Sequence, residues 1–198
     1  MKRLLILPVL LLTLLVGNPA SSADFQKGVD AYERGDYATA LREWTPLAKQ
    51  GYAPAQYKLG VMYAKGDGVP QDYKTAVKWY TLGAEQGNAF AQNNLGWMYD
   101  EGRGVPQDYK TAVKWYRLAA EQLEVHAQSN LGVMYDNGQG VLQDYVRAHM
   151  WYNIAAISGK SKNASKNRDI VAKRMSSSQI ETAQKLAREC VRKKYKGC

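Results

Sequence analysis

Residues 59–80 read LGVMYAKGDGVPQDYKTAVKWY, and the same stretch returns twice further along the chain. It recurs at 95–116 as LGWMYDEGRGVPQDYKTAVKWY and at 131–152 as LGVMYDNGQGVLQDYVRAHMWY. Successive copies are 36 residues apart. A fixed period of this length indicates an array of structural repeats, in which each unit packs mainly on its neighbours.

Each copy predicts two helices joined by a loop. In the first full copy Pro54 stands where the first turn of a helix tolerates proline, and Gly66 can end that helix. Asp72 can cap the second helix with its carboxylate, and Gly87 can take the left-handed conformation that closes it. The sequence therefore predicts an all-α fold, an α/α solenoid of about five antiparallel helix pairs.

The copies define the expected units. We expect a helical repeat array over 24–158, with a divergent first unit at 25–50 and full repeats at 51–86, 87–122 and 123–158. Two residues of the last repeat depart from the pattern. Leu123 stands where Gly51 and Gly87 stand, so this helix end is expected to be strained or extended. Leu142 replaces a loop proline, which should loosen that loop slightly.

Residues 159–198 differ from the repeats and are expected to form basic C-terminal capping helices. Gly159–Asn163 reads as a polar linker, Ala164–Met175 as one helix, and the serines at 176–178 as capping residues of another. Of the formal net charge of +9, residues 160–198 carry twelve Lys or Arg and three Asp or Glu, whereas residues 4–159 sum to −2. This basic segment is either a solvated cap or a weak contact for an anionic membrane surface.

The N-terminus has the layout of a signal peptide. Lys2 and Arg3 precede an apolar run, Leu4–Val16, and small residues follow up to Ala23. A spanning helix needs about 20 apolar residues, so a membrane anchor is the weaker alternative. We expect residues 1–23 to be a signal peptide that is cleaved after Ala23, and the protein to be periplasmic or secreted. Nucleic acid is then not an expected partner.

The only two cysteines are Cys190 and Cys198. An even count in an exported protein favours a disulfide, which would staple the last helix to the C-terminus. Two free or intermolecular thiols in a mobile tail are the alternative.

The unit A-x-x-x-L-G-x-x-Y, followed by a G-x-G-V-P loop and D-Y-x-x-A-x-x-W-Y, resembles the Sel-1-like repeat family of tetratricopeptide-type α/α proteins. In one copy the match rests on Ala55, Leu59, Gly60, Tyr63, Gly66, Gly68, Asp72, Ala76, Trp79, Tyr80 and Ala84. The resemblance implies an adaptor or scaffold role in protein complexes. One cysteine-rich branch of the family is reported to bind or hydrolyse β-lactams, but that branch carries a cysteine pair in each repeat and the repeats here contain none.

No constellation of catalytic, cofactor-binding or metal-binding residues emerges. His126 and His149 do not stand at ligand spacing from another His or Cys. Gly159-Lys160-Ser161 lacks the upstream glycine of a phosphate loop. The aspartates at 72, 108 and 144 are explained as helix caps, and the tryptophans at 79, 115 and 151 as packing between repeats. The sequence therefore favours a non-enzymatic protein without a cofactor, a β-lactam-active enzyme being the alternative by family analogy.

What remains is a binding surface for an unknown protein or peptide. In related arrays the first helices line the concave face, and their variable positions are the candidate groove contacts: Tyr57, Val61, Phe90, Asn93, Trp97, Asp100, Ser129, Val133 and Asp136. Trp97 stands out because its equivalents are Val61 and Val133. It is either a binding anchor, as Trp often is at interfaces, or a filler of a wider gap between repeats.

Overall fold

The computed structural model describes residues 19–159 and 161–198, and these form ten α-helices without a strand. The helices are α1 Pro19–Glu33, α2 Tyr37–Lys49, α3 Ala53–Lys65, α4 Tyr73–Glu85, α5 Ala89–Glu101, α6 Tyr109–Ala120, α7 Val125–Asn137, α8 Tyr145–Ile157, α9 Lys162–Ala172 and α10 Ser177–Arg192. The prediction of an all-α repeat solenoid is confirmed. None of the described helices has the length and apolar character to cross a membrane.

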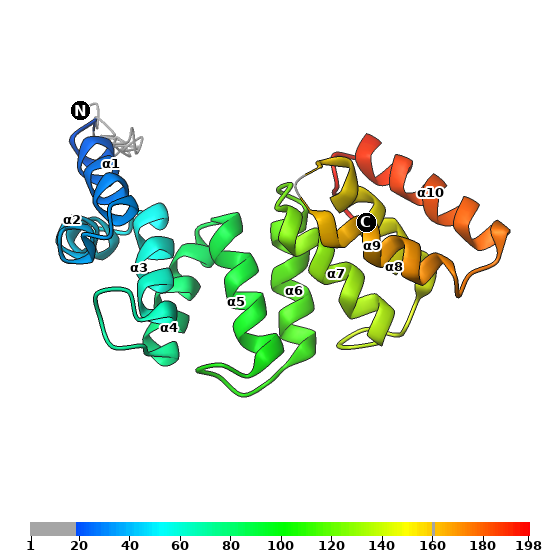
Figure 1. The fold of residues 1–198 in the computed structure, drawn as a ribbon, viewed down its shortest axis with the longest axis horizontal. Coiled ribbons are helices and arrows are strands. Elements are labelled where there is room, and N and C mark those ends of the chain that lie inside the picture. Colours follow the sequence, from blue (N-terminus) through cyan, green and yellow to red (C-terminus); the bar gives the residue numbers. More distant parts are fainter. Residues whose placement is uncertain (1–18, 160) are drawn as a thin grey trace, which may run out of the picture.

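The first eight helices form four hairpins that stack side by side along the array (Figure 1). Within each unit the first helix packs on the second, and each second helix also packs on the first helix of the next unit. α3 additionally approaches α5, and α7 approaches α9. The first helices of the second and third units are therefore neighbours, and Asn130 on α7 also bonds Asn93 on α5, as expected for helices that line the inner side of an array.

The helix ends follow from local sequence, as predicted. The Asp72 carboxylate accepts hydrogen bonds from the amides of Lys74 and Thr75, and from the Thr75 hydroxyl. The Thr75 side chain is the main cause that holds the pKa of Asp72 below its usual value. Gly66, with φ 83°, closes α3 in the left-handed region that favours glycine. Asp108 caps α6 in the same manner, whereas Asp144 caps α8 through the amide of Arg147 alone.

A glycine in each first helix lets the partner helix come close. An added Cβ at Gly60 would lie 2.5 Å from the ring of Tyr80, and Gly132 meets Tyr152 in the same way. In the divergent first unit Trp44 takes the place of the tyrosine and packs on Gly28. The contact between this glycine and a buried ring is thus repeated in every unit of the array.

The predicted role of the tryptophans as packing residues fits their positions. Trp79 packs on the cluster formed by the first and second units, and Trp115 on the cluster formed by the second and third. Trp151 is fully buried between the third and fourth units.

Buried glutamines join neighbouring units, and these were not singled out from the sequence. Gln56 donates to the carbonyl of Ala48 at 3.1 Å, and Gln92 donates to that of Ala84 at 3.0 Å. Each bond satisfies a carbonyl at the end of the preceding helix. The third member of the series, Gln128, bonds Ala120 at 3.3 Å.

The junction at Leu123 is strained, as expected. Leu123 has φ 69°, the conformation that Gly51 and Gly87 adopt at the equivalent positions. The leucine side chain makes this conformation sterically unfavourable, whereas glycine adopts it without that cost.

The C-terminal helices differ from the expectation in extent and packing. α9 begins at Lys162, not Ala164, because the Ser161 hydroxyl caps the amide of Ala164, and it ends at Ala172 rather than Met175. The predicted capping box of Ser176 with Gln179 is present at the start of α10. α10 packs mainly on α8 and not on α9, so the last two helices do not repeat the hairpin of the earlier units.

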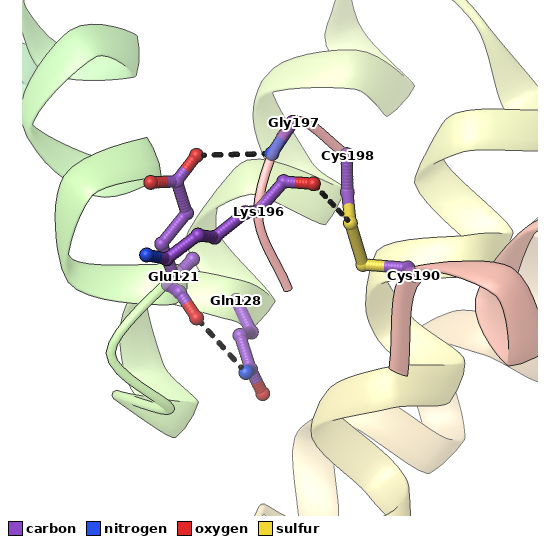
Figure 2. The surroundings of a disulfide bond; sticks show 7 residues. Glu121, Gln128, Cys190, Lys196, Gly197 and Cys198 are labelled. Carbon is purple, nitrogen blue, oxygen red and sulfur yellow. Dashed lines mark hydrogen bonds between the residues drawn. A yellow bond between two sulfur atoms is a disulfide. The ribbon is translucent and has the colours of Figure 1, made fainter. Parts of the chain in front are cut away.

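The predicted disulfide joins Cys190 to Cys198 and closes a C-terminal hook, residues 193–198 (Figure 2). The hook reaches back to the end of α6, where the amide of Gly197 donates to Glu121 at 3.4 Å. Tyr195 and Cys198 pack on the core of the last units. The disulfide therefore holds the C-terminus against the last repeat and the end of α6.

The N-terminal expectation lies mostly outside the described residues. Residues 1–18 of the expected signal peptide are not among them. The described backbone of α1 begins at Pro19 and continues through the expected cleavage point after Ala23.

Candidate functional site

The nine candidate groove residues lie on α3, α5 and α7, and the structure brings three of them together. Tyr57 and Val61 from α3 and Trp97 from α5 line one cavity of about 490 Å³. Its remaining walls come from the same helices, from α4 and from two loops: Ala64, Lys65, Gln71, Tyr73, Tyr80, Asn94, Met98 and Arg103. We call this space the α3–α5 cavity.

Trp97 forms one wall of the α3–α5 cavity and carries a cation on its face. The guanidinium carbon of Arg103 lies 4.7 Å from the centroid of the Trp97 ring and 5.3 Å from that of Tyr73. Arg103 also donates to the Tyr73 hydroxyl at 2.7 Å. Two rings therefore contact the exposed guanidinium, because cations are attracted to aromatic faces.

Trp97 also packs between repeats. Its half-buried ring contacts both the cluster of the second and third units and the cluster of the third and fourth. The two sequence-based interpretations of Trp97 thus describe the same side chain, which fills the gap with one part and lines the cavity with another. Whether it anchors a ligand stays a prediction.

Tyr57 separates the α3–α5 cavity from a second one. Its ring lies 6.3 Å from Tyr80 and 5.6 Å from Phe90, centroid to centroid. The second cavity, of about 390 Å³, is lined by Phe25, Pro54, Tyr57, Lys58, Asn88 and Phe90. Phe90 is 57% exposed, which is unusual for a phenylalanine and leaves an aromatic face open at the groove.

Lys58 lies against aromatic rings of the first and second units. Its ammonium is 5.7 to 6.0 Å from the ring centroids of Trp44, Tyr32 and Tyr57. Burial is the main cause that lowers the pKa of Lys58 from its usual value, while Glu33 acts in the opposite direction.

The other five candidates lie outside these cavities, and three have partners within the protein. Asn93 accepts a hydrogen bond from Asn130 at 3.2 Å. Asp100 accepts from the Tyr116 hydroxyl at 3.1 Å, and burial raises the pKa of this carboxyl although the tyrosine opposes the shift. Asp136 pairs with Arg174 of the C-terminal segment at 3.0 Å. Ser129 and Val133 are half-buried on α7.

Lys65, Tyr73 and Arg103 of the cavity wall were missed from the sequence, because only selected positions on the first helices were considered. Lys65 is the last residue of α3, whereas Tyr73 and Arg103 lie outside the first helices. The signal was present for two of them. Arg103 stands where the other repeats have Asp67 and Gln139, and Lys65 stands where they have Glu101 and Asn137. Departures from a repeat pattern, in loops as well as in helices, mark positions that the shared packing does not require.

The site offers surfaces for binding. Aromatic faces, three side-chain amides and three cations line the two cavities, and groups of these kinds can stack on a ligand and hydrogen-bond to it. His126 is exposed and His149 is buried in α8. No group of three or more metal-ligating side chains occurs among the described residues.

Two solved structures are similar to this chain. One is a Sel1 repeat protein from Oxalobacter formigenes, with 38% sequence identity and a TM-score of 0.59 over 66% of this chain and 97% of that one. The other is a protective antigen present in uropathogenic Escherichia coli strains that displays an SLR fold, with 31% identity and a TM-score of 0.55. That match covers 88% of this chain but only 46% of the antigen, so the chain spans less than half of the antigen's length.

The family follows from the repeats themselves. Among curated protein sequences no match is found. A sequence profile of the Sel1 repeat matches residues 53–88, 89–122 and 125–160, and these spans start at the first residues of α3, α5 and α7. Because the three matches cover more than half of the chain, the protein belongs to the Sel1 repeat family.

Proposed function

We propose that this protein is a non-enzymatic scaffold that holds a peptide, or an extended segment of a partner protein, against the inner face of its array. Sel1 repeats generally serve protein–protein interaction. The observation that carries the proposal is the meeting of Tyr57 and Trp97 in one cavity, at positions where the sister repeats have smaller side chains. Exposed aromatic side chains in a recess are typical anchors of protein interfaces.

Site-specific photo-crosslinking tests the location of the binding face. A photoreactive amino acid replaces Phe90 at the groove or, as the control, Leu82 on α4, which is also exposed. We expect a discrete crosslinked partner from position 90 and none from position 82. Crosslinking from position 82 alone would place binding on another face and contradict the proposal.

The enzymatic alternative has a separate test. The cysteine pair lies in α10 and the hook, outside the repeats, unlike the pairs that mark the β-lactam-active branch. We expect the purified protein to leave a chromogenic β-lactam unhydrolysed. Turnover that is abolished by a groove substitution would replace the scaffold proposal by an enzymatic one.

We also propose that the protein acts outside the cytoplasm, in the periplasm or after secretion. The basic and apolar N-terminal residues and the disulfide both support this, since disulfides persist in oxidising compartments. N-terminal sequencing of the protein from a fractionated producing cell is expected to begin at Asp24. A cytoplasmic chain that retains Met1 would contradict it.

A weak contact with anionic membrane surfaces is a further part of the proposal. Lys185, Arg188 and Arg192 are exposed on α10, within the segment that holds the excess of positive charge. We expect salt-sensitive co-sedimentation with vesicles that contain phosphatidylglycerol, and its loss when these three residues are changed to glutamate. Equal sedimentation of the two proteins would show that α10 is only a solvated cap.

A further inference from the structure

We propose that the α3–α5 cavity recognises an acidic residue of the bound peptide, flanked by an aromatic or aliphatic residue. This inference deepens the proposed function and rests on it. The chemistry of the ligand is read from the charges that line the cavity, from the orientation of Arg103, and from a comparison with the equivalent surface of the next repeat.

The lining of the two adjoining cavities is cationic. Lys65 and Arg103 line the α3–α5 cavity and Lys58 lines its neighbour, while no carboxylate of the described residues lines either one. Three acids act on residues of this region without lining either cavity: Glu33 on Lys58, Glu124 on Tyr57 and Asp67 on Tyr32. Asp67 accepts a hydrogen bond from the Tyr32 hydroxyl, and the Lys65 ammonium donates a hydrogen bond to that hydroxyl at 3.5 Å.

Arg103 is arranged as a receptor for a carboxylate. Its exposed guanidinium contacts Trp97 and Tyr73 and bonds the Tyr73 hydroxyl, which limits the conformations it loses when a ligand binds. Within the part of the chain that the structure describes, none of the salt bridges involves Arg103. A guanidinium forms its strongest hydrogen bonds with planar carboxylates, often through two N–H groups at once.

The repeat period provides an internal comparison. Ala64 of the cavity wall corresponds to Asp100 and Asp136 in the next two repeats. In the same way, Lys65 corresponds to Glu101 and Arg103 to Gln139. The surface one repeat further along therefore has two carboxylates and a neutral amide in place of an alanine and two cations. Since the shared packing tolerates either set, the positive charge between α3 and α5 is not a requirement of the fold.

The apolar part of the cavity defines the rest of the ligand. Tyr57, Val61 and Trp97 present rings and a branched aliphatic side chain beside the cations. A ligand that satisfies both sets carries a carboxylate next to an apolar side chain. A single-stranded nucleic acid also combines negative charge with stacking, and it is kept as a competing outcome of the test.

The test is selection of peptides from a random displayed library on the purified wild-type protein, followed by fluorescence anisotropy with the selected peptides. We expect selected sequences to be rich in Asp and Glu beside aromatic or aliphatic residues, and their affinity to fall with added salt. A labelled single-stranded oligonucleotide is measured in parallel. Tighter binding of the oligonucleotide at the same site would overturn the proposal.

The variants use residues that sister repeats carry at the same positions, so the fold is expected to accept them. Ala64→Asp introduces the repelling carboxylate, and Arg103→Gln removes the guanidinium. Each should weaken the selected peptide about tenfold or more, which is the scale of a hydrogen bond to a charged group. The control is Lys78→Glu on α4, an exposed charge reversal outside both cavities, which should change the affinity by less than about twofold.

The results separate this inference from the proposed function. Selected peptides that are neutral or basic, and that lose affinity on Trp97→Val but not on Ala64→Asp, would leave groove binding intact and overturn the acidic specificity. A library that yields no peptide dependent on Tyr57 or Trp97 would overturn both. A circular dichroism melt of each variant confirms that it is folded.

Discussion

At the residue scale, Gly60 shows how a small side chain sets the distance between two helices. A Cβ at this position would lie 2.5 Å from two atoms of the Tyr80 ring, and that ring is buried. Alanine favours an isolated helix over glycine by about 1 kcal/mol, whereas overpacking a core costs about 1–3 kcal/mol. We therefore expect Gly60→Ala to lower the free energy of unfolding by about 1–2 kcal/mol, measured by urea denaturation.

Gly83 is the matched control, because it lies in α4 and its equivalents are Ala119 and Ala155. An added Cβ there would lie 3.2 Å from the Cβ of Ala91 and 3.3 Å from the carbonyl oxygen of Ala53, contacts that need shifts of only a few tenths of an ångström. Gly83→Ala should change the unfolding free energy by less than about 0.5 kcal/mol, since the gain in helix propensity offsets these contacts. If both variants lost the same stability, close approach at Gly60 would not be the cause.

His149 is a buried residue whose protonation opposes folding. Its Nδ1 atom has no hydrogen-bond partner among the described residues, and burial, followed by the nearby Arg168, lowers the pKa below its usual value of 6.5, while Asp169 opposes this shift. The unfolded chain then binds the proton first as the pH falls. The contribution of His149 to stability should be constant above neutral pH and decrease as the pH drops through about 6.5 toward the lower folded pKa.

Substitution isolates that contribution. His149→Val introduces the residue that stands at positions 77 and 113. One proton accounts for at most about 1.4 kcal/mol per pH unit, so the wild-type loss between neutral and mildly acidic pH should exceed that of the variant by no more than this slope. Urea midpoints at several pH values give both curves. Parallel curves would mean that His149 binds its proton as readily in the folded state.

How far the sequence predicts individual residues depends on how local their interactions are. The caps Asp72, Asp108 and Asp144 bond amides two or three residues away, so their role is visible in the sequence. Arg103 is different, because its contacts to Tyr73 and Trp97 depend on how a loop folds over the preceding repeat. Its departure from the repeat pattern marks it as unusual but does not reveal its neighbours.

At the scale of elements, the packing of α10 on α8 was not predicted, although α8 carries one sequence signal for it. Met150 stands where Lys78 and Lys114 are exposed in α4 and α6, yet it is only 2% exposed. This replacement of a solvated lysine by methionine is the sequence signal that a further helix covers α8. The pattern at 176–192 predicted an amphipathic helix but not its partner, because an apolar stripe can pack on any matching face.

The disulfide gives a prediction about the hook, residues 193–198. Reduction, or the pair Cys190→Ser and Cys198→Ser, removes the covalent tie that holds the hook against α6 and α8. Because the closed loop is short and terminal, the global loss should stay at or below about 3 kcal/mol. Hydrogen exchange should instead accelerate locally, at the amides of Tyr195 and Gly197, which bond to Cys190 and Glu121.

The amide of Ala76 in α4, which bonds the Asp72 carbonyl, provides the reference for that experiment. Its exchange should be the same in the oxidised and reduced proteins if the hook opens alone. Equal acceleration at Ala76 and Tyr195 would show that the disulfide supports the whole array and not only its end.

At the scale of the whole molecule, the array is predictable because the same interface recurs. The contacts of Gly60 with Tyr80 return at Gly96 with Tyr116 and at Gly132 with Tyr152, so one correct unit yields the solenoid. The candidate site is less predictable for the same reason. It arises where Trp97 and Arg103 break the repetition, and their meeting with Tyr57 depends on how two units stack.

Stacked repeats need an end that tolerates water, and α9 and α10 provide it here. Deleting residues 162–198 would uncover Met150 and Ile154 on α8, which are buried here although their equivalents on α4 and α6, Lys78, Lys114, Leu82 and Leu118, are exposed. An exposed apolar face of this kind promotes association. We expect the shortened protein to elute as oligomers in size-exclusion chromatography with light scattering, while the full protein serves as the reference for the intact array.

Met150→Lys should have opposite effects in the two backgrounds. In the full protein it places a charge at a buried position and should lower the free energy of unfolding by about 1–3 kcal/mol. In the shortened protein it restores the lysine that α4 and α6 carry on their exposed faces, so the monomeric fraction should rise. Destabilisation in both backgrounds would contradict the view that α10 is what makes an apolar residue necessary at position 150.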